Sequence, residues 1–115
     1  MSDCVRVDRE LSAAGAAWEQ GLEGKARVCA RRAVALADQA WLVAAGDPLW
    51  QGDAMAHLRR IQQQAEFPLP VRQAAERLTT SVTRRHDTPF TDDPVKDAGL
   101  ISAHLAGHRS SGGLS

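Results

Sequence analysis

Apolar residues recur at steps of three and four positions along most of the chain, and this spacing most constrains the fold. In the first segment the recurring residues are Cys4, Val7, Leu11, Ala14, Trp18 and Leu22. Such spacing places side chains on one face of an α-helix, whereas a half-buried strand requires strict alternation. β-branched residues are scattered without period-2 runs, so strands are not expected. The sequence therefore predicts an all-α fold.

Glycine and proline divide the pattern into helices. Gly21 and Gly24 end the first segment, and Gly46 and Pro48 end a second helix expected over about residues 24–45. Apolar residues cover well over half of the circumference of this second helix. Because such a helix is packed by neighbours on several sides, it is the predicted central helix. Its alanines allow those neighbours to approach closely.

Three further helix starts follow from local signals. Asp53 is an expected N-cap, Pro70 suits the first position of a fourth helix, and Asp93 with Pro94 suits the start of the last. Four main helices with short connections predict an antiparallel four-helix bundle with an additional short C-terminal helix. Residues 1–108 are expected to form a single domain and residues 109–115 a flexible tail.

Composition limits the class of protein. A chain of 115 residues with 43% hydrophobic and 24% charged residues is typical of one small folded domain. No apolar run reaches the roughly 18 residues of a membrane span, and the N-terminus lacks an apolar signal stretch. We therefore expect a cytoplasmic protein without membrane contact, in which Cys4 and Cys29 are reduced thiols. The small core makes a homodimer plausible, since a partner would cover leftover apolar surface.

The net charge of zero conceals an uneven distribution. Residues 24–85 contain ten basic and five acidic residues, whereas both flanking segments are net acidic. Four cations crowd the first half of the central helix: Lys25, Arg27, Arg31 and Arg32. Cations are unfavourable at the positive end of a helix dipole, whereas free N–H groups there suit a phosphate or carboxylate. The four residues therefore form a candidate anion-binding site. The alternative is that Glu19 and Glu23 neutralise them.

Candidate catalytic and metal sites are few. Arg84, Arg85 and His86 form a possible secondary site at the expected end of the fourth helix, where arginines also serve as caps. His104 and His108 have a spacing that can share a metal, but no glutamate follows His104 as a metalloprotease general base would require. We therefore predict no metal, no cofactor and no catalytic residue. Trp41 and Cys29 are expected in the core, and His57 at the surface or its edge.

The order of elements resembles that of a known family. A first helix ends in small residues over 13–21, a Gly-Lys-Ala-Arg-Val-Cys-Ala-Arg-Arg-Ala run over 24–33 opens a long Ala-rich helix, and Asp-Asp-Pro precedes the last helix with its Asp97-Ala98 pair. This arrangement, over roughly residues 8–106, resembles the HEPN domains. These are small α-helical bundles that are often called nucleotide-binding and are frequently dimeric.

The resemblance implies a noncatalytic member. HEPN ribonucleases carry an arginine, four to six residues and then a histidine, but the corresponding positions before His86 are Thr79, Thr80 and Ser81. A noncatalytic member would bind a nucleotide, RNA or a nucleotidyltransferase-like protein partner, with the Lys25, Arg27, Arg31 and Arg32 cluster as its contact surface. The alternatives are a purely structural or protein-interaction helical protein, and a ribonuclease that uses His86 with Arg84 or Arg85.

Overall fold

The part of the chain that the structure describes is entirely helical apart from its connections. The computed structural model describes residues 3–79 and 93–114, and the side chains of residues 5–79 and 93–107. These residues form α1 (Asp3–Glu19), α2 (Glu23–Ala44), α3 (Ala54–Gln63), α4 (Leu69–Thr79) and α5 (Pro94–Leu114). No described residue lies in a strand. The predicted all-α fold is confirmed.

The helix ends follow the local signals of the sequence. Gly21 and Gly46, each two positions past the last residue of α1 and α2, have φ angles of 78° and 91°. These are left-handed conformations in which glycine is favoured. The Asp53 carboxylate accepts a hydrogen bond of 2.8 Å from the N–H of Ala56 and caps α3 as predicted. Asp93 caps α5 in the same way, through the N–H of Lys96 at 3.1 Å.

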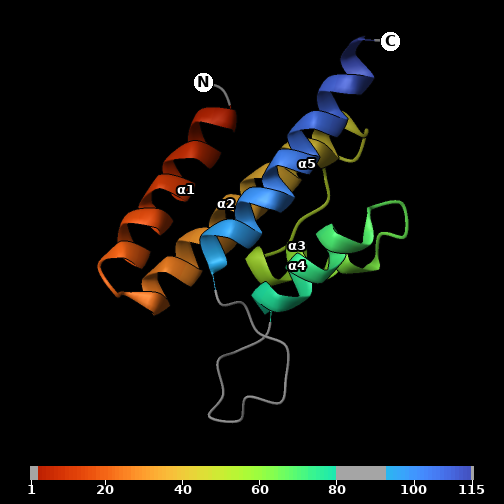
Figure 1. The fold of residues 1–115 in the computed structure, drawn as a ribbon. Helices are drawn as coiled ribbons and strands as arrows, with labels where there is room; N and C mark the ends of the chain where they lie inside the picture. Colours follow the sequence, from red (N-terminus) through yellow and green to blue (C-terminus); the bar gives the residue numbers. More distant parts are fainter. Residues whose placement is uncertain (1–2, 80–92, 115) are drawn as a thin grey trace.

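The helices pack in two groups (Figure 1). α1 runs antiparallel to α2, and α5 lies against both of them. α3 and α4 pack on each other, α3 against α2 and α4 against α5. The predicted four-helix bundle with a short last helix is not confirmed, because α5 has 21 residues and contacts α1, α2 and α4. Residues 109–115 are predicted to form a flexible tail. In the structure the α5 backbone is helical as far as Leu114, and the flexibility itself stays a prediction.

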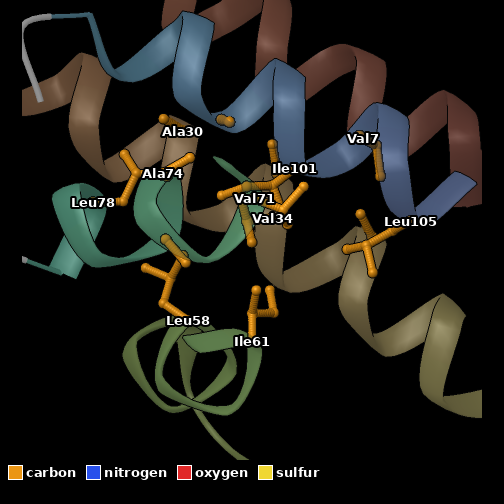
Figure 2. Packing of buried hydrophobic residues seen from close by; sticks show 14 of the residues in the cluster. Val7, Ala30, Val34, Leu58, Ile61, Val71, Ala74, Leu78, Ile101 and Leu105 are labelled. Atoms are coloured by element: carbon orange, nitrogen blue, oxygen red, sulfur yellow. The ribbon is translucent and has the colours of Figure 1, made fainter. Parts of the chain in front are cut away.

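The core lies where α2 and α5 meet the α3–α4 pair. Figure 2 shows Val34 of α2 and Ile101 of α5 near Val71 of α4, with Leu58 and Ile61 contributed by α3. Alanines on α2 keep the helices close, as expected from its composition; the fully buried ones are Ala26, Ala30 and Ala33. Cys29 is a buried free thiol, as predicted. Within residues 3–79 and 93–114, no helix is long and apolar enough to cross a membrane.

Candidate anion-binding groove

Three arginines from two helices line a groove between α1, α2 and the start of α3. Arg6 and Arg9 come from α1, and Arg32 comes from α2. The remaining lining residues are Glu10, Ala35, Leu36 and Ala54, and the groove has a volume of about 540 Å³. This volume lies within the range of small-molecule sites, which are usually about 300–1,000 Å³.

Helix geometry explains how these arginines meet. Arg6 and Arg9 are three positions apart and so lie next to each other on α1. Val7, between them in sequence, is buried in the core and fixes the rotation of the helix. α1 runs antiparallel to α2, which places the first turns of α1 beside the middle of α2. Arg32 on α2 therefore lies beside the two arginines of α1.

The groove carries an excess of positive charge. A guanidinium is protonated at any physiological pH, and Glu10 is the acidic side chain in the lining. Arg9 and Arg32 are exposed, and neither forms an ion pair or a side-chain hydrogen bond with the described part of the chain. Within that part of the chain, the charges of these two arginines are therefore available to an anion from solution.

The first turn of α3 reaches the same groove at Ala54. A helix N-terminus carries a partial positive charge that favours anions. The Asp53 carboxylate already accepts a hydrogen bond from the Ala56 N–H at this end, so it offsets part of that charge. We therefore ascribe the positive character of the groove mainly to its arginines.

The four cations predicted to act together have different surroundings in the structure. Arg32 lines the groove, but Lys25, Arg27 and Arg31 do not. Arg31 Nε donates a hydrogen bond of 2.8 Å to the carbonyl oxygen of Leu78, in the last turn of α4. Burial, and then the neighbouring Arg27, lower the pKa of Arg31. Arg31 is thus a cap for α4, while Lys25 is exposed away from the groove.

Two groove residues were missed by the sequence analysis. Arg6 and Arg9 belong to a segment whose net charge is acidic, so the sum of its charges hid them. Their spacing of three positions, which puts two arginines side by side on one helix face, was the signal that could have identified them. The predicted secondary site of Arg84, Arg85 and His86 lies outside the described residues.

A second polar cluster is buried between α2 and α3. Asp38 on α2 is 0% exposed, and its Oδ2 lies 2.7 Å from Nδ1 of His57, which is 4% exposed. Arg60 donates from Nε to the same oxygen at 3.0 Å and from Nη2 to Oδ1. The prediction of a surface or edge position for His57 is wrong. One turn of α3 separates His57 from Arg60, and both side chains reach the Asp38 carboxylate.

Aromatic rings cover this cluster. The Trp50 ring lies 4.6 Å from the His57 ring, and the Arg60 guanidinium lies 4.9 Å above the Trp41 ring. Phe67 meets Trp41 edge-on at 5.3 Å and His104 at 5.4 Å. Two donors thus satisfy the buried carboxylate under a cover of rings, an arrangement that fixes α3 on α2. The His108 side chain is outside the described part, in which no group of three or more metal-ligating side chains occurs.

The comparisons with known proteins add no relative. No family model, curated protein or solved structure matches the chain. The HEPN resemblance therefore stays an expectation from element order.

Proposed function

We propose that the protein is a noncatalytic helical module that binds a phosphate-bearing anionic ligand in the groove of Arg6, Arg9 and Arg32. The observation that supports this is that three arginines line one groove, with Glu10 as the acidic residue among the lining. The planar fork of an arginine matches two oxygens of a phosphate, and hydrogen bonds between charged groups are about twice as strong as neutral ones.

We propose that the module is a HEPN-like four-helix bundle, homodimeric and cytoplasmic, with a nucleotide, an RNA phosphate or a nucleotidyltransferase-like protein as its partner. We propose the groove, rather than the predicted cluster of Lys25, Arg27, Arg31 and Arg32, as the contact surface. Arg32 belongs to both, because it lies on α2 next to Arg31 but points to α1.

The size and lining of the groove favour a small ligand over an RNA strand. Sites for single-stranded nucleic acid combine positive charge with aromatic rings on which bases stack. The seven lining residues include no aromatic side chain, and the volume is about 540 Å³. A phosphorylated small molecule therefore fits these observations better than an extended polynucleotide.

Thermal unfolding tests the proposal. Inorganic pyrophosphate, as a compact phosphate probe, should raise the thermal midpoint of the protein, and the shift should shrink with added salt. Ligand at a hundredfold excess over its dissociation constant stabilises by about 2.7 kcal/mol. The double variant Arg9→Gln, Arg32→Gln should show a much smaller shift at the same ligand concentration. A midpoint that no phosphate compound moves would reject the proposal in favour of a protein-interaction role.

A further inference from the structure

We infer that the ligand of the groove is a phosphate ester with free hydroxyl groups, the chemistry of a sugar phosphate, and that Glu10 recognises the hydroxyls. This inference rests on the proposed function, since it assigns the ligand class of the same site. The groove proposed to hold the phosphate also contains an acidic residue, Glu10, whose carboxylate would repel a simple anion.

Glu10 lies among the three arginines without pairing with them. It follows Arg9 directly and lies one turn from Arg6 on α1, half-buried in the groove lining. Its carboxylate forms no ion pair within the described part of the chain. A carboxylate weakens the attraction of a phosphate through like-charge repulsion, so its presence favours a ligand that also supplies a hydrogen-bond donor.

The charge of the groove decides which donor fits. An ionised carboxylate only accepts hydrogen bonds, so the ligand must bring an N–H or O–H group. An ammonium group would be repelled by the guanidinium groups of Arg6, Arg9 and Arg32, which line the same groove. A hydroxyl donates without carrying charge. The arginines then hold the phosphate, and Glu10 accepts from one or two hydroxyls.

The remaining lining residues of the groove are suited to contact the carbon skeleton of a ligand that has an aliphatic ring or chain. Ala35, Leu36 and Ala54 present small aliphatic surfaces. Such surfaces pack against the C–H groups of a sugar or polyol. They offer no aromatic ring on which a nucleobase could stack. A sugar phosphate therefore uses every kind of side chain in the groove, whereas the base of a nucleotide has no matching partner there.

Calorimetric titrations with four probes test the inference. We expect ribose 5-phosphate to bind the wild-type protein about tenfold more tightly than methyl phosphate, the gain from charge-assisted hydroxyl contacts. AMP should bind no more tightly than ribose 5-phosphate. In Glu10→Met the preference for ribose 5-phosphate should vanish, while inorganic phosphate binds as well as before or better. Glu19→Met is the matched control, because Glu19 is an exposed acid on α1 outside the groove.

The outcomes separate this inference from the proposed function. Equal affinity of the wild type for methyl phosphate and ribose 5-phosphate would overturn the role of the hydroxyls but leave the phosphate site intact. Much tighter binding of AMP would overturn the sugar phosphate class in favour of base recognition. Retention of the ribose 5-phosphate preference in Glu10→Met would overturn the role of Glu10. Failure of every probe would overturn both proposals.

Discussion

His57 Nδ1 lies 2.7 Å from Oδ2 of Asp38, and this contact joins α3 to α2 through two buried side chains. Because the carboxylate can only accept, Nδ1 carries the proton in this hydrogen bond. His57 is three positions after Ala54, which lines the groove. The pair therefore helps to fix the position of one wall of the candidate site.

Removing the carboxylate of this pair should destabilise the fold strongly. Asp38→Ala removes the buried acceptor that His57 and Arg60 share, and breaking a buried ion pair in this way costs about 3–5 kcal/mol. Urea unfolding followed by circular dichroism measures the loss. Asp47→Ala, at an exposed position, is the control and should change little. An equal, small effect of both substitutions would show that the cluster contributes no stability.

Position 52 requires glycine because the Trp50 ring and the Ala56 side chain lie too close for any larger residue. A Cβ there would lie 2.7 Å from Cη2 of Trp50 and 2.8 Å from Cβ of Ala56, both too close for real contacts. Gly52→Ala should therefore displace the Trp50 ring and destabilise the protein by about 1–3 kcal/mol, with a change in tryptophan fluorescence.

Gly15→Ala provides the matched comparison. A Cβ at this position in α1 meets nothing within 4 Å. Because alanine is favoured over glycine inside a helix, the substitution should stabilise the protein by roughly 0.5–1 kcal/mol. The same sign of effect for both glycine substitutions in urea unfolding would contradict the packing of Trp50 over Gly52.

Arg31 should affect stability without affecting ligand binding. Arg31→Met removes the donor to the Leu78 carbonyl and should lower the unfolding free energy by about 1 kcal/mol. Pyrophosphate affinity, measured by calorimetry, should be unchanged because Arg31 does not line the groove. A large loss of affinity in this variant would instead support the predicted cluster of Lys25, Arg27, Arg31 and Arg32 as the binding site.

The ion pair of Arg77 and Asp97 should stabilise the contact of α4 with α5. Arg77 donates from Nε and Nη2 to the two carboxylate oxygens at 3.1 and 2.9 Å, and the hydrogen bond to Asp97 is the main cause that raises the pKa of Arg77. Because the pKa of Arg77 is higher in the folded protein, protonated Arg77 stabilises the fold. This stabilisation is complete at pH values below the ordinary arginine pKa, and it is lost only as the pH rises through the raised pKa of the folded state.

The raised pKa of Arg77 determines how the effect of removing the Asp97 carboxylate should depend on pH. Asp97→Asn should lower the unfolding free energy by about 1–3 kcal/mol, because Asp97 is buried and loses charge-assisted bonds. The loss should be the same at neutral and mildly alkaline pH, where Arg77 stays protonated in both proteins. A loss that disappears between these two conditions in urea unfolding would contradict the assignment.

Local signals in the sequence were enough to predict five helical segments, but not the length of the last helix or the residues that meet in the candidate sites. Asp53 and Asp93 act on residues three positions away, so their capping could be predicted. Asp38 bonds to residues 19 and 22 positions away, and nothing local indicates those partners. Arg31 and Arg32 are neighbours in sequence, but about 100° of helix rotation directs one to α4 and the other to α1. Only the packing of the helices decides which arginine meets a groove.

Calorimetric titration of pyrophosphate at low salt tests the central claim most directly. The groove variant Arg9→Gln, Arg32→Gln should lose at least about tenfold in affinity, since each guanidinium supplies charge-assisted hydrogen bonds. The control variant Lys25→Gln, Arg59→Gln removes the same charge at exposed positions outside the groove and should bind like the wild type. Equal affinities for the wild type and the groove variant would contradict the account, as would an equal loss in both variants.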